Sequence, residues 1–186
     1  MKNDCLLQRT ALAVLILGYS TVGMAQDWSS SIALALGQKQ LKSRDWEQAD
    51  EQDSIGLIMD FQRNNLPFSI AVDVLASGVD KSGSADPYEG YTAELHLGLR
   101  RSLALGNSGF QVYGGAGMAL GHAEIELTNP LRSGDGRGVG YWAGAGLRYE
   151  ISSRFSLGAD LRQSAIDING TATGGRQFSF TFIYTL

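Results

Sequence analysis

The sequence of 186 residues predicts an all-β fold, an eight-stranded antiparallel up-and-down barrel that crosses a membrane. Three observations predict it. Eight stretches alternate apolar and polar residues with a period of two, which is typical of strands with one apolar face. The segments between these stretches alternate in length, as the turns and loops of such a barrel do. The chain also carries 24 Gly and only 3 Pro, a composition that permits strongly curved strands.

The first 25 residues are expected to be a cleaved signal peptide and not part of the fold. Lys2 and Arg9 precede an apolar run, ALAVLILGY, and small residues lead up to Gln26. The barrel is then the single domain of residues 26–186. No later apolar run approaches the ~18 residues of a spanning helix, so a membrane protein of this sequence has to cross as strands.

Charge and cysteine content narrow the function classes. Removing the leader takes away Lys2, Arg9 and Asp4 and leaves 13 basic and 18 acidic side chains, a balance that argues against nucleic acid as a partner. The only cysteine, Cys5, leaves with the leader. A secreted chain without a disulfide needs another source of stability, and a closed hydrogen-bonded barrel is one.

The first four expected strands each carry one apolar face. Residues 28–36 alternate Trp, Ile and Leu with Ser and Ala, and residues 54–62 alternate Ile, Leu, Met and Phe with Gly, Asp and Gln. Residues 68–75 set Phe, Ile and Val against Ser, Ala and Asp. Residues 91–100 set Tyr and Leu against Thr, Glu, His, Gly and Arg. Each pattern indicates a strand.

The last four strands continue the pattern. They are expected within residues 110–120, 139–149, 155–161 and 176–186. The final stretch, RQFSFTFIYTL, places aromatic side chains on every second position and mostly Gln, Ser and Thr between them. The long connections are expected at SGVDKSGSADP, HAEIELTNPLRSGDGRG and DINGTATGG, and three-residue turns at 64–66 and 151–153.

Alternation alone fits both a soluble barrel with an apolar core and a membrane barrel with a polar lumen. The polar face here combines charged residues with many glycines, as a narrow lumen requires, because large and small side chains must alternate inside eight strands. The apolar face carries aromatic residues near the strand ends, like the two interfacial girdles of a membrane barrel. A soluble lipocalin-like barrel would instead turn its charges outward. The sequence therefore favours the membrane barrel.

The segments GFQVYGGAGMALG and GYWAGAGLRYEISSRFSLGADLRQS, with the terminal aromatic strand, resemble the outer-membrane β-barrel families, porin-like and opacity-type, of Gram-negative bacteria. The resemblance covers essentially all of the mature chain and rests on pattern. It implies insertion by the outer-membrane assembly machinery, which reads a final strand usually ending in an aromatic residue. This chain departs from that signal, because it ends in Leu186 with Tyr184 two residues earlier on the same face.

Charged residues on the polar face are the first candidate site. The structural interpretation is a lumen network that satisfies its own charges, and the functional one is a proton-sensitive or ligand-contacting cluster. The candidates are Asp60, Asp73, Glu94, His96, Arg148, Asp160 and Arg162.

Enzymes occur on barrels of this size, and lipid A deacylases and palmitoyltransferases are similar to this chain in length. The deacylases need a His-x-Ser pair to activate a hydroxyl. Neither His96 nor His122 supplies it, which leaves only a triad assembled from distant residues, such as His122 in the expected third external loop with a loop serine. The glycine runs have no dinucleotide fingerprint and the acidic loops have no Ca²⁺-loop spacing, so we expect no cofactor and no metal.

We therefore expect a non-enzymatic, monomeric outer-membrane protein with an envelope-structural or surface-interaction role. A small porin-like channel and, third, a lipid A-modifying enzyme are the alternatives. The expected partners are outer-membrane lipid, lipopolysaccharide and the assembly machinery. Exposed loop residues are the interaction candidates: Trp46, Tyr88, Arg132 and Arg137.

Overall fold

The computed structural model describes residues 28–41, 46–81, 87–128, 131–168 and 170–186, and the expected signal peptide lies outside them. Within these ranges one antiparallel sheet closes on itself, because β7 pairs with both β9 and β6. Eight strands form the ring, and the short β8 pairs with the end of β7. The strands are β1 Trp28–Gln40, β2 Glu51–Arg63, β3 Ser69–Asp80, β4 Tyr88–Ala104, β5 Phe110–Thr128, β6 Leu131–Glu150, β7 Phe155–Ile168, β8 Thr171–Ala172 and β9 Arg176–Thr185. The predicted eight-stranded antiparallel barrel is confirmed.

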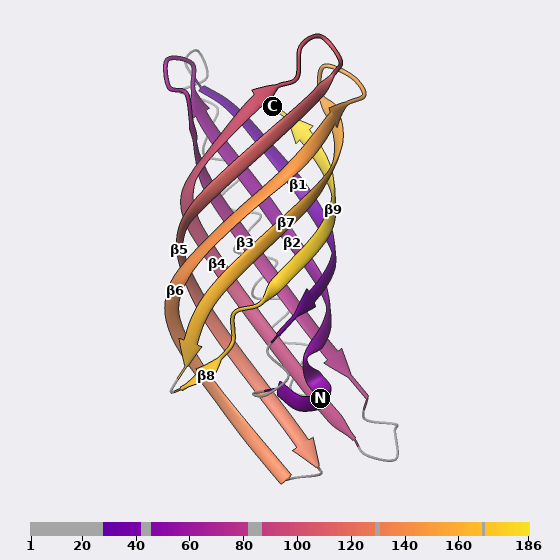
Figure 1. Cartoon of the computed structure of the whole chain (residues 1–186), viewed down its shortest axis with the longest axis vertical. Coiled ribbons are helices and arrows are strands. Elements are labelled where there is room, and N and C mark those ends of the chain that lie inside the picture. Colours follow the sequence, from indigo (N-terminus) through magenta and orange to yellow (C-terminus); the bar gives the residue numbers. More distant parts are fainter. Residues whose placement is uncertain (1–27, 42–45, 82–86, 129–130, 169) are drawn as a thin grey trace.

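The connections between strands fall into two sets at opposite ends of the barrel (Figure 1). We call the end with the three connections 64–68, 105–109 and 151–154 the turn end, and the strand termini Trp28 and Thr185 lie there too. The opposite end, the loop end, carries the 3₁₀ turn η1, Glu47–Ala49, between β1 and β2. No helix among the described residues is long and apolar enough to span a bilayer.

The last strand shows which face of the barrel is which. Phe178, Phe180 and Phe182 are exposed on the outside, whereas Ser179 and Thr181 are buried inside. The same division holds around the ring, because the buried inward side chains are largely polar and the exposed outward ones are Leu, Ile, Val, Met, Phe and Tyr. The outer face is therefore apolar and the lumen polar, as the sequence predicts.

Several strands extend further toward the loop end than predicted. The expected long loop HAEIELTNPLRSGDGRG is largely a β-hairpin, because β5 continues to Thr128 and β6 begins at Leu131. β3 continues to Asp80, and β7 continues to Ile168. The prediction of loops was wrong there because the apolar residues change face: Ile125 and Ile168 point inward, although the apolar residues earlier on their strands point outward.

Candidate functional site: a filled lumen and a polar groove

Five charged side chains alternate in sign across the lumen. The Arg148 guanidinium bonds Asp60 at 2.8 Å, and Asp60 accepts a second bond from Arg100 at 2.6 Å. Arg100 also bonds Asp73 at 2.7 Å, and Asp73 accepts from Arg162 at 2.8 Å. The five residues come from five different strands, so the pairs connect the barrel walls through its interior. Asp73 is fully buried between two arginines.

Aromatic side chains complete this network. The Tyr113 hydroxyl donates to Asp160 at 2.6 Å, and Asp160 also accepts from Arg162 at 2.7 Å. The Tyr113 ring lies 4.4 Å from the Arg148 guanidinium carbon, within cation–π range. Glycine is required opposite this ring, since a Cβ at Gly146 would lie 2.4 Å from the Tyr113 ring. Small and large side chains thus alternate inside the barrel, as an eight-stranded lumen demands.

A second cluster centres on Glu94. Lys39 donates to Glu94 at 2.5 Å, and His96 Nε2 lies 2.7 Å from the other carboxylate oxygen. His96 Nδ1 lies 3.4 Å from Arg162, and an arginine N–H only donates, so Nδ1 accepts and Nε2 carries the hydrogen given to Glu94. The His96 ring stacks on Trp142 with centroids 5.3 Å apart. This cluster therefore joins the arginine network to the loop-end half of the lumen.

Charges in the combined network balance, with four basic side chains opposite four carboxylates. Burying a charge without a partner is costly, whereas a paired and hydrogen-bonded set is tolerated. The network fills the lumen and neutralises itself. Its paired members are Lys39, Arg100, Arg148, Arg162, Asp60, Asp73, Glu94 and Asp160.

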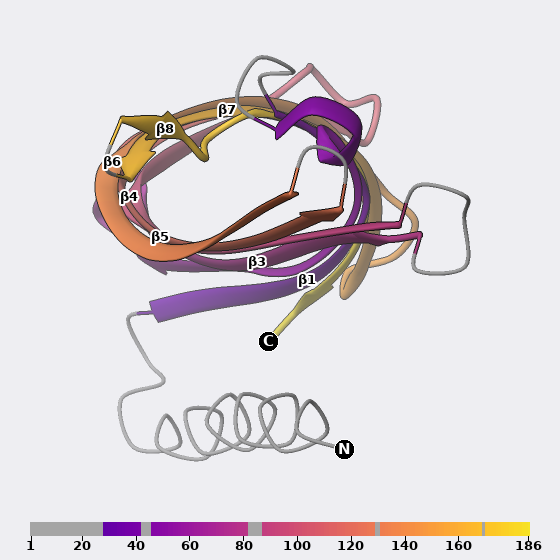
Figure 2. The ribbon, with the colours of Figure 1, turned by 90° about the horizontal axis from the view of Figure 1, so that it is seen from below.

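Toward the loop end an apolar cluster replaces the charges. Trp46, beside η1, is only 1 % exposed, and its indole N–H donates to the Ala172 carbonyl at 2.9 Å. It belongs to a buried cluster with Leu41, Ile125 and Ile166. Figure 2 looks into this end of the barrel and shows η1 at the rim of the mouth. The connection between β1 and β2 thus contributes a large side chain to the closure of the lumen.

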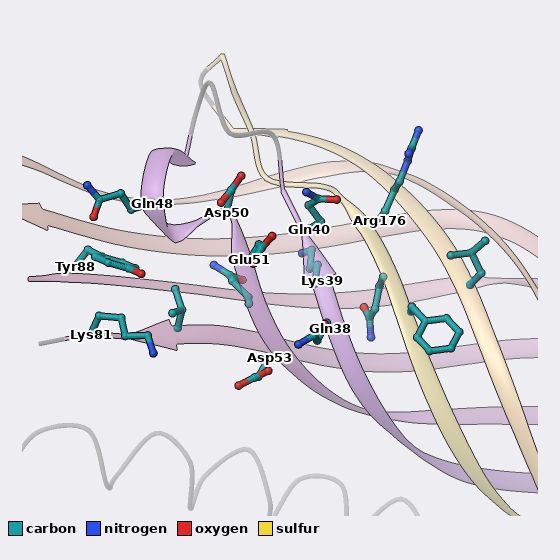
Figure 3. A pocket seen from close by; sticks show the side chains of 15 residues that line it. Gln38, Lys39, Gln40, Gln48, Asp50, Glu51, Asp53, Lys81, Tyr88 and Arg176 are labelled. Carbon is teal, nitrogen blue, oxygen red and sulfur yellow. The ribbon is translucent and has the colours of Figure 1, made fainter. Parts of the chain in front are cut away.

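A polar groove of about 510 Å³ opens at the same end, between the β1–β2 hairpin, the start of β4 and β9 (Figure 3). Amide and carboxylate side chains dominate its lining, and Tyr88 and Phe178 add aromatic rings. Its polar lining includes Gln38, Gln40, Gln48, Asp50, Glu51, Asp53, Lys81 and Arg176.

The structure brings the predicted network residues together, whereas the predicted loop residues differ from one another. Trp46 is buried and not exposed, because the apolar cluster at the mouth takes up its ring. Tyr88 is half-buried against the same cluster and also borders the groove. Arg137 is exposed on the outer face of β6, and the side chain of Arg132 lies outside the described residues.

Two members of the network were missing from the predicted set. Arg100 is the last residue of the predicted strand 91–100 and lies on the polar face of that strand. The alternation alone therefore places Arg100 in the lumen. Lys39 lies three residues beyond the expected end of the first strand, but continuing the alternation from Ala33 and Ala35 places it inside. Arg100 follows from the parity of its own stretch, and Lys39 follows from extending the alternation past the expected strand end.

The two histidines have partners other than a serine hydroxyl in the described part of the chain. His96 is fully buried against Glu94. His122 lies in β5, not in a loop, and its Nδ1 bonds the Gly136 carbonyl at 2.9 Å. Among the described residues, no group of three or more His, Cys, Asp or Glu side chains is placed to hold a metal ion.

Comparison with protein families decides the relationship. The family model for the outer membrane protein beta-barrel domain matches residues 10–185, nearly the whole sequence. The chain belongs to this family. Its location is therefore the cell outer membrane, and the resemblance drawn from the sequence is confirmed. The comparison with curated proteins returned no match.

Solved structures of outer-membrane barrels share the fold at low sequence identity. Ail of Yersinia pestis is 16% identical with a TM-score of 0.63, covering 87% of this chain and 100% of that one. Neisserial surface protein A is 15% identical with a TM-score of 0.58, covering 86% and 96%. A major outer membrane protein from Thermus thermophilus is 12% identical with a TM-score of 0.64, covering 86% and 99%. These likenesses show the barrel fold alone.

Proposed function

We propose that the chain, after removal of residues 1–25, crosses the outer membrane with its eight ring strands and acts there as a sealed, non-enzymatic barrel. On β6 the outward side chains from Tyr149 to Val139 are aromatic, aliphatic or alanine. Ten residues at ~3.3 Å each, tilted by ~40°, cover ~25 Å, the height of the apolar band of such barrels. The turn end then faces the periplasm and the loop end faces outward.

The filled lumen is the observation that carries this proposal. Ion pairs cross the interior from wall to wall, and Trp142 and Tyr113 are buried among them. At the loop end Trp46 and its apolar neighbours occupy the mouth. A solute would have to break several buried ion pairs to pass, and each is costly to break. The channel alternative is therefore not favoured.

We further propose that the loop end serves surface interaction through the polar groove. Its three acids, Asp50, Glu51 and Asp53, face three basic side chains, one of which, Lys39, already pairs with Glu94. The groove therefore has no excess positive charge. Amides and carboxylates bind hydroxyl pairs well, and aromatic rings offer flat apolar faces. A neutral, hydroxyl-rich ligand such as an oligosaccharide fits this lining.

One relative offers a contrast in ligand charge. Ail has been crystallised with the heparin analogue sucrose octasulfate, a polyanion. The charge balance of this groove gives a polyanion nothing to neutralise, so we expect the present chain to discriminate against sulfated sugars.

Conductance tests the sealed lumen. Folded protein in planar bilayers should give no steady current, while the folded state is checked by heat-modifiable gel migration of outer-membrane fractions. Reproducible channels whose conductance changes in Arg162→Ala would favour the porin-like alternative. Recovery of the protein from the periplasm without detergent would end the membrane assignment.

Binding to immobilised oligosaccharides tests the groove. The folded protein should retain neutral oligosaccharides above their sulfated counterparts, and Asp53→Ala should weaken retention about tenfold, the equivalent of one hydrogen bond to a charged group. Glu124→Ala removes an exposed carboxylate on the outer face of β5, away from the groove, and is the matched control. Equal losses in both variants would contradict the groove assignment.

A further inference from the structure

A second hollow lies on the outer face of the barrel, over β3 to β6. It measures about 450 Å³ and is mostly apolar. Val74, Leu95, Leu120 and Val139 form its floor, and the strand register places them side by side: Val74 opposite Leu95, Leu95 opposite Leu120, and Leu120 opposite Val139. These side chains belong to the apolar belt that faces hydrocarbon. We call this hollow the lateral groove.

The next row toward the loop end changes character abruptly. Ala93 is small and leaves space above Leu95, while His122 lies opposite Ala93 and Arg137 opposite His122. Both basic residues line the lateral groove. The lateral groove therefore has an apolar floor and, on its loop-end side, an edge with the cation Arg137. Along each strand the edge residue lies two positions from the floor residue.

The height of this edge matches the head-group region of the outer leaflet. Val139 ends the apolar belt on β6, and Arg137 is the next outward residue. Two residues of a tilted strand rise ~5 Å, so the guanidinium lies just beyond the hydrocarbon. A lipid whose chain runs along the floor would bring its head group to Arg137.

Arg137 is available to an anion. Within the described part of the chain Arg137 makes no ion pair, and its side chain is exposed. His122 Nδ1 donates to the Gly136 carbonyl, so Nε2 of this tautomer is an acceptor and has no hydrogen to give to an anion. An arginine fork is well suited to the oxygens of a phosphate.

Acidic residues just above the edge restrict which anions bind. Glu124 lies opposite Asp135 in the following row, and both are exposed on the same face. Their field opposes a free anion in water. A ligand that also buries an acyl chain gains ~0.8 kcal/mol for each CH₂ removed from water, and this gain outweighs the repulsion. The groove therefore selects anions that carry acyl chains.

We propose that the lateral groove is a binding site for an acylated, phosphate-bearing lipid of the outer leaflet, with a chain on Leu95, Leu120 and Val139 and the phosphate on Arg137. The site is separate from the polar groove, and its test does not depend on the ligand of that groove. Failure of either leaves the other standing.

Native mass spectrometry of the detergent-purified, folded protein tests the proposal. Phosphatidic acid should remain bound about tenfold more than phosphatidylcholine with the same chains, and Arg137→Gln should remove that preference. Ala93→Phe fills the hollow without changing charge and should also lower retention of phosphatidic acid. Arg101→Gln is the matched control, because Arg101 is an exposed outward cation on β4 near the turn end. It should retain the wild-type preference.

Three outcomes would overturn the proposal. Equal retention of the two lipids would mean that Arg137 does not select the head group. Binding of inorganic phosphate as strong as that of phosphatidic acid would assign an anion site without a chain. A dimer that disappears in Ala93→Phe would mean that a second copy of the chain covers the groove.

Discussion

The turn-end and loop-end halves of this barrel have opposite interiors. Near the turn end the lumen holds buried ion pairs, such as Arg100 with Asp60, and the outer face is aliphatic and aromatic. Near the loop end the lumen holds Ile125 and Ile166 around Trp46, and the outer face carries acids such as Glu124. A single strand, β5, passes through both halves without a break in its pairing.

The difference teaches that the medium, and not the backbone, decides which face is apolar. Pleating sends alternate side chains to alternate faces throughout. Where the outside is hydrocarbon, apolar residues face outward, and where it is water, they face inward as in a soluble protein. In the proposed orientation, the reversal between Leu120 and Ile125 marks the outer limit of the membrane on β5.

The charged interior should give the largest effect when it is broken. Asp73→Asn removes the carboxylate that two buried arginines share and should cost about 3–5 kcal/mol of unfolding free energy. Urea unfolding of the protein in lipid vesicles measures this. Asp135→Asn, on the exposed outer face of β6, should change stability by less than about 0.5 kcal/mol. Equal losses of unfolding free energy in the two variants would mean that the buried arginines are solvated by water and do not depend on the ion pairs with Asp73.

The last strand compares the outer face with the lumen directly. Phe180→Arg or Phe182→Arg should cost about 2–4 kcal/mol and impair assembly, because an ionised side chain there meets hydrocarbon. Thr181→Asn should be much milder, because its neighbours in the lumen are polar. Single cysteines at 180 and 182 should react with a lipid-phase label, and a cysteine at 181 should not. The reverse labelling would show that the barrel is inside out.

Sequence alone predicts most of the fold, because strand alternation and connection lengths are local properties. It fails where the medium changes: on β7 the outward apolar residues are Leu157 and Leu161, but Ile166 and Ile168 have the opposite parity. Where the apolar residues move to the other face, the alternation is interrupted, and this interruption looks like the end of a strand. The missing strand ends at the loop end are therefore the expected error of an interpretation that assumes one phase throughout.

The candidate site is predictable in part for the same reason. The alternation along each strand places Asp73 and Arg162 in the lumen. That these two side chains pair with each other depends on the register between strands, which the alternation does not contain. The burial of Trp46 has no periodic signal, because this residue lies outside the strands. The two grooves are lined by side chains from four or more strands, so they exist only in the closed barrel.

The smallest expected effect tests the reversal on one strand. Ile166→Val and Leu157→Val each delete one methylene from β7, the first inside at the loop end and the second on the outer face. The inner change leaves a space among packed side chains and should cost about 0.5–1.5 kcal/mol. Lipid chains fill the space left by the outer change, which should stay within about 0.5 kcal/mol. Both are measured as shifts of the urea midpoint in vesicles, with folding confirmed by gel migration. A larger loss for Leu157→Val than for Ile166→Val would mean that the loop-end cluster is loosely packed and that the apolar residues do not change face because of the medium.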